Sequence, residues 1–445
     1  MEVWRSVTGT AGVKILVMTV GGLLGIISSR IIIQHFGVAA YAQYGLLAGM
    51  STLLPFADLG IGAVVLNVIA GSDDPTNSDR VRLALMTAIR ALCVSGCAII
   101  AISIVIGVAG WWPLLLGKGL IAGSSLTATL CLCIVGISLP LGIGVRILIG
   151  LRRNMLQALL QSIQSPLFVL SIAILALVGL DRSGHFIPVL SYLGASVSSA
   201  ILLLVGARMI SPQLHRAIHD VPHVRTVPGI RVIATAAPVL VQSFAMPVAM
   251  QSDRLLLSHR STTDKLAQYT FAAQIFGMIM QAIVAGGVAL WPYFARARAR
   301  NEILNPTKLM VAFLIGSLAI STTLAFATPL IEQVVANGRV HLPLTLIISF
   351  VLLTAVQALN YPPGMYMTDE RGLQFQVIPI IAMTVANVAL SWLLIPPLGA
   401  AGPVLGSAVS VFIFQVVPYT WWVRRDVRSR RIAAATRTPI ADVLS

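Results

Sequence analysis

Four charged side chains lie inside or at the ends of long apolar runs of this sequence. Arg30 falls in the first run, Asp58 deep in the second, and the adjacent Asp253 and Arg254 at the end of the seventh. If such runs cross a bilayer, one charge near the middle costs about 2.5 to 3.5 kcal/mol, so it needs a cavity, a partner or a route to water. Each of these residues is therefore a candidate functional site.

Arg30 and Arg254 have the chemistry of an anion site. A guanidinium group offers a planar set of donors that binds carboxylates and phosphates in bidentate fashion, and two of them suit a pyrophosphate. We expect both to line a substrate cavity, with Asp253 beside Arg254. The alternative is that each side chain extends to the nearby membrane interface, since Phe36 follows Arg30 by less than two turns.

Asp58 lies in a segment with helix-loosening neighbours. Pro55 precedes it, and Gly60 and Gly62 follow it, which is typical of a hinge or a bent gate. We therefore assign Pro55, Asp58 and Gly60 to gating or coupling. The acid could bind and release a proton during transport, or it could accept a hydrogen bond from a neighbouring backbone group.

Four further arginines form a candidate vestibule at the cytoplasmic side. Arg146 ends the fourth run, Arg152 and Arg153 follow it directly, and Arg90 lies about two turns into the third run. Together they could bind an anionic lipid head group. For Arg90 and Arg146 the favoured alternative is that the side chain extends to the interface.

The composition shows which elements must position these residues. The chain is 57% hydrophobic and only 10% charged, too few charges to cover a water-exposed surface. Its apolar runs are long enough to span a hydrocarbon core as helices. They predict an all-α integral membrane protein of about twelve transmembrane helices, at residues 12–35, 42–70, 83–109, 119–149, 155–180, 186–210, 230–253, 267–294, 308–331, 341–361, 374–395 and 401–423.

Most of the 30 Lys and Arg lie in the even-numbered loops and at the two ends of the chain. Positively charged flanks stay on the cytoplasmic side, so both termini are predicted to be cytoplasmic. Basic residues spread between apolar runs do not form the patch that binds nucleic acid, and we expect no such partner. Trp111, Trp112, Trp421 and Trp422 fall at predicted interfaces and are expected to form an aromatic belt.

No feature of the sequence indicates enzyme chemistry or a cofactor. The predicted loops are short, which leaves no room for an extramembrane catalytic domain. The phosphate-binding pattern of ATP-using proteins does not occur. The four cysteines all fall inside apolar runs and give no metal-binding or disulfide pattern.

An internal repeat relates the two halves. The segment from Ser29 to His35 aligns with that from Asp253 to His259 at an offset of 224 positions, and Tyr44 aligns with Tyr269. An even number of helices separates the copies, so they share one orientation. This predicts two parallel-repeat six-helix bundles around a central cavity, with Arg30 facing Arg254. The predicted organisation is an N-terminal lobe (1–210), a cytoplasmic linker (211–229), a C-terminal lobe (230–423) and a basic cytoplasmic tail (424–445).

The linker contains three histidines at four-residue spacing. His215, His219 and His223 would share one helix face as metal ligands. Pro222 and the exposed setting favour a solvated linker instead.

Four stretches of the chain resemble the Wzx-type lipid-linked oligosaccharide flippases, in the polysaccharide-transporter branch of the MOP superfamily, to which the MATE-type exporters also belong. The first runs from Ser29 to Leu47 across the first two predicted helices, and the second is the D-L-G-x-G pattern at 58–62. The third is the basic segment at 148–154, and the fourth is the P-x-x-G-x-x-G turn at 396–402.

The resemblance implies a bacterial inner-membrane protein that flips an undecaprenyl-pyrophosphate-linked oligosaccharide to the outer leaflet by alternating access. By position, Arg30 and Arg254 are the implied cavity cations. Its expected partners are the lipid-linked glycan, membrane lipids and the polymerase or export proteins of the same pathway. A MATE-type multidrug or cation exporter stays open as an alternative, although two repeat-related arginines favour an anion. A membrane glycan polymerase or ligase would need a larger outer loop.

Overall fold

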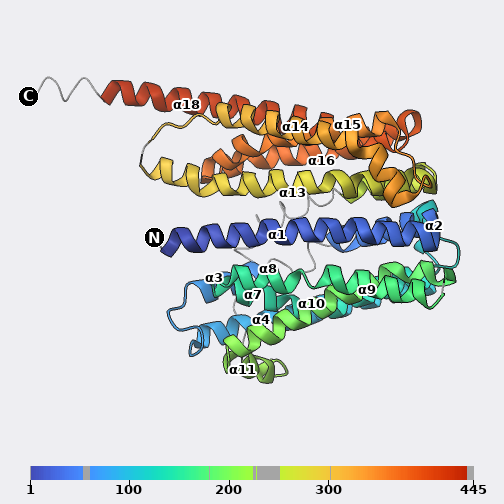
Figure 1. Cartoon of the computed structure of the whole chain (residues 1–445). Helices are drawn as coiled ribbons and strands as arrows, with labels where there is room; N and C mark the ends of the chain where they lie inside the picture. The colour runs from blue at the N-terminus through green and yellow to red at the C-terminus, as the bar shows by residue number, and fades with distance from the viewer. Residues whose placement is uncertain are drawn as a thin grey trace, which may run out of the picture. The chain divides into compact units, whose positions relative to one another are not determined.

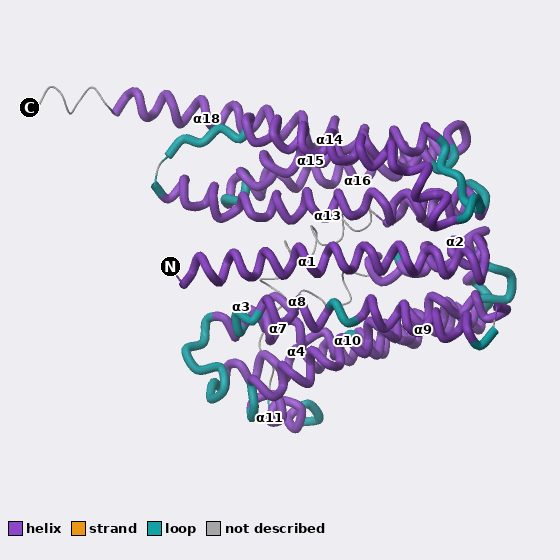
Figure 2. Tube along the Cα trace, in the orientation of Figure 1, coloured by secondary structure: helices purple, strands orange, loops and turns teal. Residues whose placement is uncertain are grey.

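The computed structural model describes residues 2–53, 61–179, 181–223, 227, 251–300 and 302–437. Within these ranges every long element is a helix and no strand occurs (Figure 2). Helices satisfy each backbone donor and acceptor internally, as a hydrocarbon surrounding requires. The prediction of an all-α protein is confirmed. The predicted gating residues Pro55, Asp58 and Gly60 lie outside the described residues, as does most of the predicted span 230–253.

The chain divides into two compact units. Unit 1 comprises Met1–Pro247, Thr262–Thr270 and Val334–Val340, and unit 2 comprises Val248–Ser261, Phe271–Gln333 and His341–Ser445. Each unit is described by itself below. The predicted boundaries of lobes, linker and tail stay predictions.

The first half of the chain supplies helices α1 to α11 to the described part of unit 1, most of which are labelled in Figure 1. They are α1 (Glu2–Ile31), α2 (Gly37–Ala48), α3 (Ile61–Ala70), α4 (Asp79–Val108), α5 (Trp112–Leu116), α6 (Ser125–Ser138), α7 (Ile143–Gly150), α8 (Asn154–Gln161), α9 (Gln164–Leu177), α10 (Ile187–Met209) and α11 (Gln213–Asp220). A π-helical turn, Ile32–Phe36, joins α1 to α2.

The second half begins with helical residues 251–260 and continues through six labelled helices. They are α13 (Thr263–Ala299), α14 (Thr307–Ile331), α15 (Leu344–Tyr366), α16 (Glu370–Leu398), α17 (Ala401–Val411) and α18 (Val417–Arg437). Two π-helical turns interrupt them, Glu332–Ala336 after α14 and Phe412–Val416 before α18.

Nine helices in the described part of the chain are long and apolar enough to cross a membrane. The count rises to ten if α6 and the following segment to Gly150, bent by 43°, form one span. The prediction of a multi-pass membrane protein is confirmed. Three of the twelve predicted spans, 42–70, 155–180 and 230–253, contain residues outside the described ranges, so the exact number stays a prediction.

The turn between α16 and α17 explains the P-x-x-G-x-x-G pattern. Gly399 has φ of +56° and ψ of −127°, a conformation that a side chain would strain. A Cβ on Gly402 would lie 2.6 Å from the carbonyl group of Leu394, so the two helices pack backbone to backbone. Glycine at these two positions is what permits this tight helical hairpin.

The structure corrects two details, the full solvation of the segment after α10 and the place of Trp112 in the tryptophan belt. Part of the predicted solvated linker is α11, whose Leu214 and Ala217 are buried in the same apolar cluster as residues of α3, α4 and α7. Trp112 is only 2% exposed and donates from Nε1 to Thr129 Oγ1 over 2.8 Å. It is therefore a core residue, because a hydroxyl from the neighbouring helix satisfies its polar group. Trp111 is exposed, as a belt residue should be.

Candidate functional site

A cavity lies inside unit 1, lined by apolar residues together with several hydroxyl and amide groups and one guanidinium group. Its volume is about 350 Å³, and Arg146 is the only charged residue among the described residues that line it. The lining residues come from α2, the turn after it, and α3, α4, α6, α7, α9 and α10; they are Ala48, Ser51, Gly62, Val65, Ala88, Leu92, Val135, Ser138, Leu139, Gly142, Ile143, Arg146, Gln164, Ser191, Tyr192, Ala195 and Ser199.

The bend between α6 and α7 brings Arg146 to this cavity. A short 3-10 turn, Pro140–Gly142, separates the two helices. Gly142 and Arg146 are four residues apart, so they lie on the same face, and both line the cavity. The next residue, Ile147, lies on another face and is fully buried in the apolar cluster that also contains residues of α3, α4 and α11. The amphipathic pattern of α7 therefore fixes which side the guanidinium occupies.

Hydrogen bonds within unit 1 hold the cavity wall in place. Tyr192 Oη donates to Leu47 O over 2.6 Å and accepts from Ser51 N over 3.2 Å, which ties α10 to the end of α2. Ser138 Oγ lies 2.5 Å from Ser196 Oγ, which ties α6 to α10. One guanidinium among neutral hydroxyl and amide groups offers an anionic, hydroxyl-rich ligand both charge and hydrogen-bonding partners.

The structure does not bring the other predicted vestibule arginines to this cavity. Arg152 and Arg153 are exposed in the turn between α7 and α8. Arg90 is half-buried on α4 and donates to three backbone carbonyls, to Asp220 O over 2.6 Å and to Val221 O and Val227 O over 2.9 Å each. It anchors the end of α11, so for Arg90 the observed contacts are structural.

A salt bridge strengthens the same anchor. Arg82 Nη1 lies 3.2 Å from Asp220 Oδ2. Two arginines of α4 thus bind the C-terminal end of α11, where exposed carbonyl groups favour a cation. No group of three or more His, Cys, Asp or Glu side chains gathers as a metal site within the described ranges.

The predicted central pair is divided between the two units. Arg30 lies in the last turn of α1 in unit 1, and its side chain is exposed. Arg254 lies in helical residues 251–260 of unit 2 and is half-buried. That the two face each other across a cavity stays a prediction.

Asp253 is the centre of a buried polar cluster in unit 2. Its side chain is 4% exposed and accepts from Ser391 Oγ over 3.3 Å and from Ser407 Oγ over 3.2 Å. Asn387 Nδ2 donates to Ser407 Oγ over 2.7 Å. Oxygen atoms of carboxylate, hydroxyl and amide groups are ligands that hard cations prefer. The spacing of Asn387 and Ser391, four residues apart in a mostly apolar stretch of α16, is a sign of this cluster in the sequence that was not used above.

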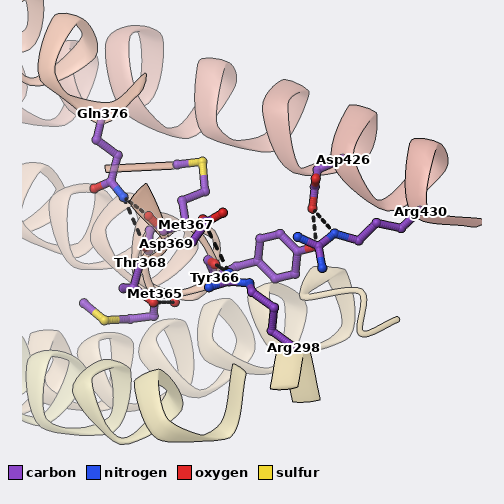
Figure 3. Close-up of polar contacts among 10 residues, drawn as sticks. Arg298, Met365, Tyr366, Met367, Thr368, Asp369, Gln376, Asp426 and Arg430 are labelled. Carbon is purple, nitrogen blue, oxygen red and sulfur yellow. Dashed lines mark hydrogen bonds and ion pairs between the residues drawn. The ribbon is translucent and has the colours of Figure 1, made fainter. Parts of the chain in front are cut away.

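A second polar cluster in unit 2 joins helix ends (Figure 3). Arg298 of α13 donates to Tyr366 O and lies 3.6 Å from Asp369 Oδ1. Tyr366 Oη donates to Asp426 Oδ2 over 2.7 Å, and the same oxygen accepts from Arg430 Nε over 2.8 Å. The contacts hold the ends of α13, α15 and α18 together. Each aspartate of the cluster lies beside an arginine, so their charges offset one another.

The comparison with protein families decides the classification. Residues 3–298 match a family described as polysaccharide biosynthesis protein. The chain belongs to this family. A curated relative described as a putative O-antigen transporter, from Salmonella typhimurium (strain LT2), is 24% identical over 188 residues. The match covers 40% of this chain and 43% of that protein, so it spans less than half of the relative's length.

Solved structures share the fold. The chain is similar to an inward-facing multidrug resistance MATE family transporter of the MOP superfamily, with a TM-score of 0.70, 16% identity, and coverage of 95% of this chain and 99% of that one. It is also similar to the lipid II flippase MurJ in an inward closed conformation, with a TM-score of 0.65, 13% identity, and coverage of 94% and 89%. These similarities confirm the predicted all-α, MOP-type fold.

Proposed function

We propose that this protein moves a pyrophosphate-linked lipid glycan from the cytoplasmic to the outer leaflet of the bacterial inner membrane, by alternating access. The observation that carries the proposal is the cavity of unit 1, in which hydroxyl groups lie among apolar residues and the Arg146 guanidinium is the one charged group of the described lining. Membership of a polysaccharide biosynthesis family and partial similarity to a putative O-antigen transporter support a glycan as the cargo.

The chemistry of the cavity favours an anionic ligand over a cationic drug. A guanidinium next to neutral oxygens attracts phosphate or carboxylate groups, and it repels a cation that carries no compensating charge. Serine hydroxyls and the Gln164 amide match the hydroxyl groups of a sugar. Arg30 and Arg254 are proposed to supply further positive charge, and both termini are proposed to be cytoplasmic.

The MATE-type exporter is the second candidate, and Asp253 is the observation that favours it. A buried carboxylate within a set of oxygen donors is a feature that a transported or coupled cation would use. The same feature also fits a glycan flippase driven by a coupled cation or proton. The choice therefore depends on which cargo moves.

The test uses the full-length protein in proteoliposomes with a radiolabelled undecaprenyl-pyrophosphate-linked oligosaccharide. Arg146→Gln removes one charge-assisted interaction of about 1.5 to 3 kcal/mol, so cargo affinity should fall roughly 10- to 100-fold. Arg146→Lys keeps the charge and should fall less. Arg153→Gln is the matched control, because Arg153 is exposed outside the cavity.

Three results would contradict the proposal. Normal transport by Arg146→Gln would remove the cavity as the cargo site. Efflux of cationic drugs by the parent protein, with no movement of any lipid-linked sugar, would establish the exporter instead. Equal losses in Arg153→Gln and Arg146→Gln would place the anion at the predicted vestibule rather than in the cavity.

A further inference from the structure

Two short segments of the second half of the chain belong to unit 1. Residues 262–270 and 334–340 are grouped with unit 1, although the chain on both sides of the second segment belongs to unit 2. Segment 334–340 lies between α14 and α15 and reverses direction at Asn337 and Gly338, which have φ of +49° and +75°. Its contacts with α1 and α2 hold it within unit 1.

A reciprocal set of hydrogen bonds holds segment 334–340 against the corner between α1 and α2. Arg339 Nη1 donates to Ile33 O over 3.0 Å and to Gln34 O over 2.9 Å. Gln34 Nε2 donates back to Val335 O over 3.3 Å. The accepting carbonyls lie in the π-helical turn Ile32–Phe36, where the change of helical pattern leaves backbone groups available to other donors.

Apolar side chains pack next to the same contact. Val335 is 3% exposed, and Ala336 and Ile33 are fully buried. The Arg339 side chain itself is exposed, so water can compete for its hydrogen bonds. In unit 2, Glu332 accepts from His341 Nδ1 over 2.9 Å and from Leu342 N over 3.0 Å, which closes the base of the loop. The segment is thus a preformed loop that presents Arg339.

The other segment meets unit 1 at a position defined by the internal repeat. A Cβ built on Gly45 would lie 2.3 Å from the Thr270 side chain, which is 4% exposed. Gly45 follows Tyr44 and Thr270 follows Tyr269, so the two residues are repeat equivalents. Beside this contact, Thr263 Oγ1 donates to Lys118 O over 3.3 Å.

We propose that residues 334–340 form a releasable clasp on the α1–α2 corner, with Arg339 as its positioning residue and the Gly45–Thr270 contact of residues 262–270 as a second contact that opens with it. The inference rests on the proposed alternating-access function, in which each end of the protein opens in turn. A segment rooted in α14 and α15 cannot stay bonded to the α1–α2 corner when this end opens. The Arg339 hydrogen bonds must therefore break and form again in each cycle.

The first test locks the clasp. In a background without Cys93, Cys97, Cys131 and Cys133, the pair Gln34→Cys and Val335→Cys is joined by a short thiol cross-linker in proteoliposomes. Cross-linking should stop translocation of the lipid-linked glycan, and cleavage of the linker by a reductant should restore it. Single-cysteine variants treated alike are the control. Translocation at the full rate by cross-linked protein would overturn the proposal.

The second test needs no cargo. The rate at which a membrane-impermeant thiol reagent labels Val335→Cys reports how often the clasp opens. Arg339→Gln removes both hydrogen bonds and should raise that rate about tenfold. Arg300→Gln, at an exposed arginine whose recorded ion pair is with Glu302, should leave it unchanged. Gly45→Ala should also raise the rate, and Thr270→Ala in the same chain should reverse that effect.

The two tests separate the clasp from the function on which it rests. If the parent protein moves no glycan, the proposed function fails, and the clasp is judged by labelling alone. If Arg339→Gln leaves labelling unchanged, the clasp is refuted whatever the protein transports.

Discussion

Replacement of Asp253 tests whether its hydrogen bonds with Ser391 and Ser407 stabilise the protein. Hydrogen bonds to a charged group contribute about 1.5 to 3 kcal/mol each. The two bonds from Ser391 and Ser407 are 3.3 and 3.2 Å long, so both belong at the lower end of that range. Asp253→Ala should therefore lower the free energy of unfolding by about 3 kcal/mol. Asp253→Asn keeps one oxygen acceptor and should cost less.

A double-mutant cycle isolates the interaction itself. We expect a coupling energy of about 1 to 1.5 kcal/mol between Asp253→Ala and Ser407→Ala, measured by denaturant-induced unfolding of the purified protein in detergent micelles. Ser317→Ala is the matched control. Ser317 is a buried serine of α14 whose hydroxyl has no hydrogen-bond partner among the described residues. Its coupling to Asp253→Ala should be near zero.

The cycle has a clear refuting result. A coupling below about 0.5 kcal/mol between Asp253 and Ser407 is within the range of independent sites. It would mean that the hydroxyl and the carboxylate do not stabilise one another. Coupling of similar size with Ser317 would mean that Asp253→Ala disturbs the whole unit.

Two further predictions concern packing. Gly402→Ala should lower the free energy of unfolding by about 1 to 3 kcal/mol, because the new Cβ would meet the backbone of Leu394. The same unfolding assay measures this change. An unchanged value would mean that α16 and α17 separate at no cost. Arg90→Gln should release α11 and speed trypsin cleavage within that helix, because three backbone carbonyls lose their hydrogen-bond donor. Unchanged cleavage would mean that the Arg82–Asp220 salt bridge is a sufficient anchor.

Hydropathy predicted most helices well because a bilayer imposes one simple condition, a long apolar run. The spans predicted at 83–109 and 308–331 correspond to α4 at Asp79–Val108 and α14 at Thr307–Ile331. Hydropathy does not report local bends. The predicted span 119–149 is α6 and α7 with a 3-10 turn between them, because Pro140 cannot continue the hydrogen-bond pattern of a helix.

The roles of the arginines could not be predicted from their positions. Arg90 and Arg146 both lie near the predicted cytoplasmic end of a span, and both were assigned to one vestibule. The neighbouring element distinguishes them, since α11 offers carbonyl groups to Arg90 while a bend turns Arg146 toward a cavity. The docking of α11 depends on tertiary packing. An eight-residue helix with exposed histidines gives little sign of it in the sequence.

The repeat shows where the two halves have diverged. Asp253 has Ser29 as its repeat equivalent, and both side chains are buried. Ser29 Oγ bonds to Gly25 O over 2.9 Å and to Tyr41 Oη over 3.2 Å, so unit 1 satisfies this position with neutral partners. Unit 2 places a carboxylate there and surrounds it with hydroxyls. A fold that needed only packing at this position could keep serine in both halves. The buried acid therefore gives unit 2 a carboxylate at a position where unit 1 has a neutral hydroxyl.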